Sequence, residues 1–306
     1  MSMPILFLLA CSGDASDDSG SDALSEGPYL SDEVDFEAPA FDASSVSAAV
    51  DGALSQALAI NAVPVVTIYS AFMDAATADC PQWTTYEDLP VWVDSCTTAD
   101  GIAFEGYGLM IEYDGMTDAD GTTYSGYQIS SVSSMAAPDG SSLTIAGSAD
   151  LLYGVNGAYE VFYTNVSEGT RWAGGVTDSW LDWGINPSMY LYALRDTASG
   201  ARSIQLAGSV SIDDGGVSAV VFDDLYLIDD PSGTVCSAEP SGMISILSSE
   251  GQWYDLVFDG PTEDNDLVPD SLCDGCATAW FKGESLGEAC VDFSVLTDWD
   301  DNPWGL

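Results

Sequence analysis

Aromatic and arginine side chains gather in one window of the sequence, residues 171–202, and could form a ligand-binding platform. Aromatic rings stack on apolar ligand faces, and a guanidinium group binds an anionic group through paired hydrogen bonds. The alternative interpretation is that the rings fill the core of a sheet while the arginines neutralise nearby aspartates, which is the commoner use of such residues. The candidate residues are Trp172, Trp180, Trp183, Arg171, Arg195 and Arg202.

A second candidate is a calcium site in the segment DGMTDADG, residues 114–121, where carboxylates cluster beside glycines. Calcium prefers carboxylate and carbonyl oxygens in loops of this kind. The spacing does not match an EF-hand, which needs acidic residues at the first and last loop positions. In a chain with 50 acidic residues, acidic turns of this composition also arise without a metal. The candidate ligands are Asp114, Asp118 and Asp120, and no other cofactor is expected.

The chain has no histidine, which excludes Ser-His-Asp and Cys-His catalysis and histidine-ligated metals. Nucleophile elbows, Walker loops and dinucleotide-binding fingerprints are also absent from the sequence. A glycosidase that uses only paired carboxylates needs none of these features. No motif singles out such a pair among the 50 acids, so the sequence favours a protein that is not an enzyme.

The charge balance of the chain is extreme, with 50 acidic residues against 4 basic ones and a net charge of −46. A nucleic-acid partner is excluded because a basic surface is needed to replace the counterions of phosphate. The chain should nevertheless fold, since 46% of its residues are apolar and 11% are aromatic. The acidic surface indicates either adaptation to a salty external medium, where ions screen repulsion, or an ordinary acidic secreted protein.

Seven cysteines are present, and six remain if Cys11 has a separate role, which is the even number expected of an exported, disulfide-bonded chain. Cys80 and Cys96 bracket a segment rich in strand-forming residues and are expected to pair. Cys276 and Cys290 could face each other across a hairpin, which would leave Cys236 for Cys273, although 15 pairings are formally open. A zinc or redox role for Cys273-x2-Cys276 is the rival interpretation, and it lacks a second close cysteine pair.

The N-terminal sequence MSMPILFLLAC ends in Leu8-Leu9-Ala10-Cys11, which resembles the lipobox of bacterial lipoproteins. The resemblance implies that residues 1–10 are a signal peptide, that Cys11 carries the lipid (palmitate among its acyl chains), and that the membrane is a partner. Ser12 follows the cysteine, which in that family implies an exported protein of the outer membrane or cell surface. More loosely, the Cys80–Cys96 segment and the C-terminal CDGC…GEAC resemble uncharacterised Asp-rich bacterial lipoproteins, which implies no activity.

The pattern of residues divides the chain into further segments. Residues 11–41 read as an acidic, disordered tether, because they carry Ser, Gly and Asp without an apolar period. Residues 42–78 carry apolar residues at helical spacing, broken at Asn61-Ala62, and predict two short helices packed as a hairpin. Asp42 or Ser44 could cap the first helix, and Pro64 suits the first turn of the second.

Residues 79–296 change to a period of two with turn residues every 8–12 positions, and residues 297–306 form a C-terminal tail. The sequence therefore predicts a mainly β fold: a long antiparallel meander, twisted or curled, with an N-terminal helical hairpin and three disulfides. For function it predicts a lipid-anchored cell-envelope protein with a structural or binding role, with an envelope protein or a glycan as its partner. The alternative is a carbohydrate-binding or carbohydrate-processing surface protein that uses the 171–202 window and calcium.

Overall fold

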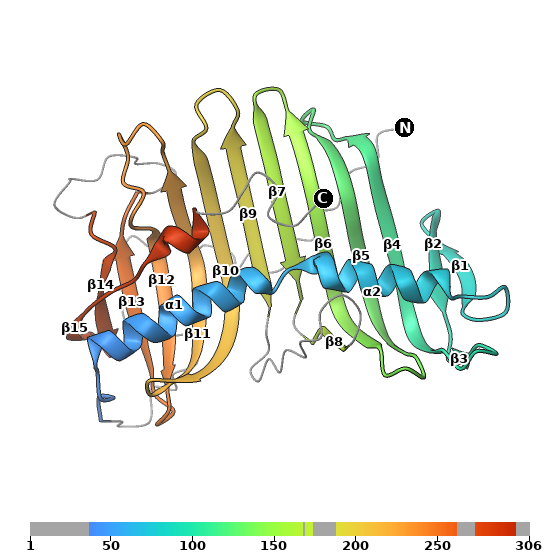
Figure 1. Cartoon of the computed structure of the whole chain (residues 1–306), viewed down its shortest axis with the longest axis horizontal. Coiled ribbons are helices and arrows are strands. Elements are labelled where there is room, and N and C mark those ends of the chain that lie inside the picture. The colour runs from blue at the N-terminus through green and yellow to red at the C-terminus, as the bar shows by residue number, and fades with distance from the viewer. Residues whose placement is uncertain (1–36, 168, 174–187, 262–272, 298–306) are drawn as a thin grey trace.

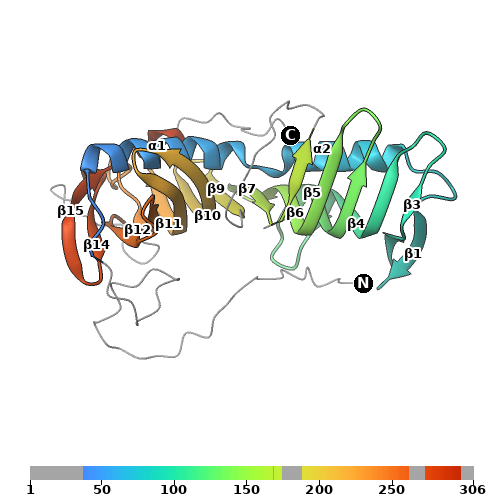
Figure 2. The same ribbon diagram turned by 90° about the horizontal axis from the view of Figure 1, so that it is seen from below.

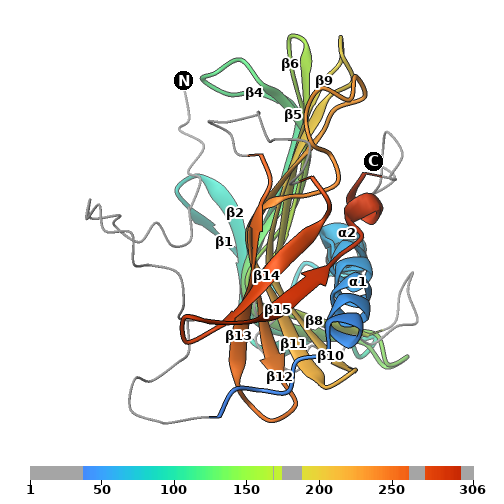
Figure 3. The same ribbon diagram turned by 90° about the vertical axis from the view of Figure 1, so that its left-hand side faces the viewer.

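The computed structural model describes residues 37–297 except for 168, 174–187 and 262–272. Within this part of the chain, all strands join one antiparallel sheet whose order follows the sequence from β1 to β15 (Figure 1). β3 and β8 lie off the main path and pair with β4 and β6. The mainly β meander with three disulfides is confirmed, and the sheet is visibly twisted (Figure 3).

The strands vary in length, and the longest ones stand in the middle of the first half of the sheet. Their bounds are β1 Gln82–Tyr86, β2 Leu89–Val93, β3 Cys96–Thr97, β4 Ala103–Thr117, β5 Thr123–Ala136, β6 Ser142–Asn156, β7 Tyr159–Val166, β8 Arg171–Ala173, β9 Met189–Asp196, β10 Arg202–Asp214, β11 Val217–Asp229, β12 Ser241–Ser248, β13 Trp253–Asp259, β14 Cys276–Phe281 and β15 Glu284–Cys290.

Two helices, α1 (Ala43–Ala59) and α2 (Ala62–Asp74), lie end to end across one face of this sheet (Figures 1 and 2). α1 contacts β10, β11, β15 and the short 3-10 helix η2 (Phe293–Leu296), and α2 contacts β5, β6 and β7. The predicted hairpin is therefore corrected to a single bent helix. Only two residues separate the helices, and the apolar stripe of each faces the sheet, so folding one back on the other would expose both stripes.

The bend between the helices is fixed by hydrogen bonds to side chains. The Asn61 side chain accepts from the Val63 amide at 3.0 Å and caps α2, while the Ala62 amide donates to the buried Thr164 hydroxyl on β7 at 2.9 Å. At the start of α1, the Asp42 carboxylate accepts from the Ser45 amide at 2.8 Å, as the sequence predicts. Each cap satisfies amides that the helix itself leaves without partners.

The core lies between the helices and the covered face of the sheet. Val50, Leu54 and Tyr69 are buried on the helix side, and the strands contribute residues such as Ile129 and Leu206. The helical stretch Ala43–Asp74 is long and apolar enough to cross a membrane by length and composition alone, and half of its most apolar window is buried within the fold. The apolar residues of this stretch therefore pack against the sheet.

A close approach between α2 and the sheet depends on one glycine. The Trp92 ring nitrogen on β2 donates to the Tyr69 hydroxyl at 2.7 Å, and both side chains are buried. A Cβ atom at Gly108 on β4 would lie 2.9 Å from each of these two polar atoms. Glycine is needed here because any larger residue would separate the hydrogen-bonded pair.

No second layer of described elements covers the opposite face of the sheet (Figure 3). Tyrosines and polar side chains on this face form hydrogen bonds between neighbouring strands. The Tyr113 hydroxyl donates to Gln128 at 3.1 Å, and the Asn165 amide donates to the buried Asp150 carboxylate at 3.2 Å. Burial raises the pKa of Asp150. This face thus mixes polar side chains held by hydrogen bonds with apolar ones such as Leu152 and Val132, as is possible where one face of an antiparallel sheet meets water.

All three expected disulfides are present: Cys80–Cys96, Cys236–Cys273 and Cys276–Cys290. The first ties the end of the helical segment to the beginning of the meander, next to the β1–β2 hairpin. The last two hold the C-terminal strands and the loop before β12. The disulfides therefore reinforce the two ends of the sheet, where neighbouring strands are fewest.

Candidate ligand-binding site

The helices cover only part of the length of the strands, and a hollow of about 580 Å³ opens beside them on the same face. β5 has 14 residues and so extends for roughly 48 Å, whereas a helix is only about 10 Å wide. The hollow lies toward the ends of β4, β5, β6, β7 and β9, beyond the helix junction. Its lining residues are Glu112, Tyr113, Asp114, Ser125, Gly126, Tyr127, Tyr153, Glu160, Phe162 and Arg195.

Three aromatic rings, of Tyr127, Tyr153 and Phe162, form the floor of this hollow. Tyr127 pairs with Leu151 across β5 and β6, and Tyr153 pairs with Phe162 across β6 and β7, so all three rings point to the helix-covered face. The rings of Tyr153 and Phe162 lie 5.0 Å apart between centroids. Cross-strand pairing therefore builds a continuous aromatic surface from three adjacent strands.

One wall of the hollow is an ion pair between Arg195 on β9 and Glu160 on β7. The Arg195 Nε donates to Glu160 Oε2 at 2.7 Å, and the Tyr153 hydroxyl donates to Glu160 Oε1 at 2.9 Å. The side chains of Arg195 and Glu160 are 23% and 18% exposed, so the pair is partly shielded but reachable from solvent. Both oxygens of Glu160 are engaged, which holds the carboxylate and the guanidinium in fixed positions.

The ion pair continues into a row of four charged residues across neighbouring strands. Arg195 pairs in register with Arg202 on β10, which pairs with Asp229 on β11. Arg202 donates to Asp229 through Nε at 2.9 Å and to the Thr297 carbonyl through a terminal nitrogen at 2.6 Å. Two of the four basic residues of the chain are thus used together, and each is neutralised by its own carboxylate.

The opposite rim of the hollow carries Glu112 and Asp114, which alternate along β4 and point to the same face as the rings. Both side chains are exposed. Together with the neutralised Glu160–Arg195 pair, they give the hollow a net negative charge. An aromatic floor with a carboxylate rim suits a ligand that has an apolar face and several hydrogen-bond donors.

The structure does not bring together the described residues of the predicted aromatic and arginine platform. Trp172 is buried in the core at 3% exposure, and Trp180 and Trp183 lie outside the described residues. Arg171 pairs with Thr144, at the other end of β6 from the Arg195 row and roughly 36 Å from it. Only Arg195 and Arg202 come together, so the guanidinium groups do not form one surface.

The three candidate calcium ligands are not gathered by the fold either. Asp118 Oδ1 accepts from the Asp120 and Thr122 amides at 2.9 Å each and so stabilises the turn between β4 and β5. Asp114 lines the hollow instead. Among the described residues, the one group with metal-ligand spacing is Cys276, Glu288 and Cys290, whose two cysteines form a disulfide.

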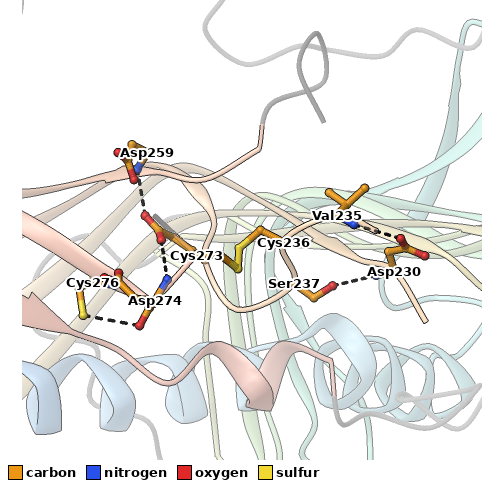
Figure 4. Close-up of a disulfide and its surroundings, with 9 residues drawn as sticks. Asp230, Val235, Cys236, Ser237, Asp259, Cys273, Asp274 and Cys276 are labelled. Carbon is orange, nitrogen blue, oxygen red and sulfur yellow. Dashed lines mark hydrogen bonds between the residues drawn. A yellow bond between two sulfur atoms is a disulfide. The ribbon is translucent and has the colours of Figure 1, made fainter. Parts of the chain in front are cut away.

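A buried glutamate in the loop before β12, three residues after Cys236, joins the end of β13 to the segment before β14; Figure 4 shows the Cys236–Cys273 disulfide of this region with Asp259 and Asp274. Glu239 is fully buried and accepts from the Asp259 and Asp274 amides, each at 3.2 Å. Burial and contact with the Asp259 carboxyl raise the pKa of Glu239 to about 7. A second hollow of about 670 Å³, lined by this disulfide and by Asp230, Asp274 and Asp292, opens nearby.

Reasoning from the sequence missed most residues of the aromatic hollow, including Glu112, Tyr127, Tyr153 and Glu160. Alternation along β4 does place Glu112 and Asp114 on one face, and this signal was available. The remaining residues meet only through the registers of β5 with β6 and of β7 with β9, which a single sequence does not specify.

We predict that Glu239 makes the protein less stable as the pH rises from about 4.5 to about 7. The folded state binds this proton more tightly than the unfolded state, so the contribution is fully present below pH 4.5 and is lost through pH 7. Chemical denaturation of wild type and Glu239→Gln at several pH values in this range measures how the free energy of unfolding depends on pH. The variant should show a shallower fall in unfolding free energy, while Glu250→Gln, at an exposed turn, should match wild type. If the unfolding free energies of wild type and Glu239→Gln fell in parallel with pH, the raised pKa of Glu239 would be contradicted.

Comparison of the chain with protein-family models, with curated proteins and with solved structures finds no match in any of the three.

Proposed function

We propose that this protein is an exported binding protein that holds a carbohydrate in the aromatic hollow. A pyranose ring presents a face of C–H groups that stacks on aromatic rings, and its hydroxyls donate to carboxylates and accept from guanidinium groups. The hollow offers both kinds of contact within one volume of about 580 Å³, which is in the usual range for small-ligand sites.

The observation that carries this proposal is the position of the three rings of the floor between two sets of charged groups. Glu112 and Asp114 lie on one side, and the Glu160–Arg195 pair lies on the other. Since the charged wall is held by Tyr153, which also belongs to the floor, the apolar and polar contacts are fixed relative to each other. Such preorganisation lowers the cost of binding.

Binding is proposed in preference to hydrolysis, because a glycosidase needs one carboxyl held in its acidic form beside the bond to be cleaved. Both oxygens of Glu160 already accept hydrogen bonds, from the Tyr153 hydroxyl and from Arg195. Glu112 and Asp114 are exposed on the rim. The three carboxylates of the hollow are therefore arranged to accept hydrogen bonds from a ligand.

The three disulfides indicate that the protein is exported, since such bonds form and persist in oxidising compartments. We further propose that it is a lipoprotein attached through Cys11 and exposed at the outer membrane or cell surface. The lipobox-like sequence Leu8-Leu9-Ala10-Cys11 supports this anchor, and the acidic residues 12–36 would separate the folded part from the membrane. A binding site for glycans at the envelope fits this position.

The carbohydrate site is tested with the purified full chain on an array of neutral, amino and acidic sugars, followed by calorimetry with the best sugar. Tyr153→Ala should weaken binding at least tenfold, because it removes a stacking ring and a partner of Glu160. Tyr159→Ala is the matched control, since Tyr159 lies on β7, the neighbour of β6, but is 48% exposed and does not line the hollow. Its affinity should stay within twofold of wild type.

A second variant, on the rim of the hollow, tests the same site even if Tyr153→Ala does not fold. Glu112→Ala is an exposed change and should also weaken binding by several-fold. The absence of binding by any sugar at millimolar concentration would contradict the proposal, as would unchanged affinity in both Tyr153→Ala and Glu112→Ala.

The anchor is tested by metabolic labelling with radioactive palmitate in a bacterial host that processes lipoproteins. Wild type should be labelled and recovered with the membrane fraction, and Cys11→Ala should lose both properties. Cys11→Ala leaves the six disulfide cysteines unchanged, so its folded part should be intact. Equal labelling of wild type and variant would refute attachment at Cys11.

A further inference from the structure

The outermost strand of the sheet, β1, has one side without a paired strand in the described part of the chain. β1 is the first strand of the sheet order and pairs only with β2 among the described elements. All five of its residues, Gln82–Tyr86, are exposed, and the side chains of Trp83 and Tyr86 are 51% and 64% exposed. The β1–β2 hairpin bends away from the helices at its end of the sheet (Figures 2 and 3).

β1 lacks the features that usually protect an edge strand. Its sequence QWTTY contains no charged residue and no proline, and its register with β2 runs without a bulge. The other edge strand, β15, carries Glu284 and Glu288, has an irregular register with β14, and is bound by the Cys276–Cys290 disulfide. The two edges of one sheet therefore differ, and only β1 presents an uncharged strand to solvent.

The register of the hairpin shows which backbone groups of β1 are open. Glu87 and Asp88 form a two-residue turn, both with positive φ, so Tyr86 and Leu89 form the first hydrogen-bonded pair. Pairs then alternate, which makes Thr85 with Pro90 and Trp83 with Trp92 the pairs without hydrogen bonds. Pro90 has no amide hydrogen, in agreement with this order. The amides and carbonyls of Trp83 and Thr85 therefore point away from β2.

We propose that β1 binds an extended segment of a partner polypeptide, which adds to the sheet as a further strand and carries basic residues at its ends. The amides and carbonyls of Trp83 and Thr85 would form the backbone hydrogen bonds, and the exposed aromatic rings would cover the partner's side chains. Acidic residues flank the uncharged strand, with Asp79 before it and Glu87 and Asp88 after it, all exposed. This pattern selects a strand with an uncharged middle and positively charged ends.

Charge also disfavours a second copy of this chain as the partner. In a symmetric antiparallel pair of β1 strands, Asp79 of one copy would approach Glu87 and Asp88 of the other. Each copy also carries a net charge of −46. A basic partner gains from the same charges that would drive two copies apart.

The test uses the full chain and two acetylated, amidated peptides with the same alternating Val and Thr core, one flanked by two lysines at each end and one by two glutamates. Hydrogen exchange measured by NMR should show new protection of the Trp83 and Thr85 amides with the lysine peptide. Its affinity at low salt should exceed that of the glutamate peptide at least tenfold.

Thr85→Pro removes an outward amide that the β1–β2 hairpin does not use, and proline is tolerated at such an edge position. Thr85→Pro should bind the lysine peptide at least tenfold more weakly than wild type does. Thr85→Val, which keeps the amide, should bind it with an affinity within twofold of wild type. An unchanged thermal transition would show that Thr85→Pro is folded.

Three results would overturn the proposal. The first concerns the peptides: neither binds at millimolar concentration, or wild type and Thr85→Pro bind the lysine peptide with equal affinity. The second is protection of the Trp83 and Thr85 amides without peptide that grows with protein concentration, which would assign the edge to a second copy. The third is protection of these amides without peptide that is the same at every protein concentration. This result would assign the β1 edge to another segment of the same chain.

Discussion

One bent helix must bury the apolar face of a very wide sheet, and the rest of the structure depends on this constraint. The thirteen strands along the sheet path span roughly 58 Å, while the 17 and 13 residues of α1 and α2 span about 45 Å. The helices can cover this width only if they lie end to end. The Asn61 cap and the bond from Ala62 to Thr164 make that arrangement specific.

The regions that the helix does not cover are the regions with distinctive chemistry. Beyond the helix along the strands, tyrosines and an ion pair replace aliphatic residues and leave the aromatic hollow. Beyond the helix across the sheet, β1 lies next to the Cys80–Cys96 disulfide and has no strand on its outer side among the described elements. The chain's net charge of −46 adds repulsion, and two of its three arginines, Arg195 and Arg202, are used in ion pairs next to the hollow.

The sequence was sufficient to predict the features that depend on local pattern. Period-two segments predicted the meander, Asp42 and Pro64 marked the helix starts, and the spacing of the six cysteines led to the observed disulfides. The direction of α2 relative to α1 was predicted wrongly, because the sheet that receives both helices forms only from distant segments. The site was predicted least well: Arg195 and Asp114 were named, but for a platform and a metal site that strand register does not assemble.

The most direct test of this account is the free energy of unfolding of Leu54→Ala, followed both by helical circular dichroism and by tryptophan fluorescence. Leu54 is fully buried between α1 and the sheet, so the variant should lose about 2–5 kcal/mol with the two signals still coincident. Gly52→Ala, on the exposed side of the same turn with no atom near its added Cβ, should gain roughly 1 kcal/mol. A loss below about 1 kcal/mol in Leu54→Ala, or loss of the helical signal while the tryptophan transition is unchanged, would show that the sheet does not depend on the helix.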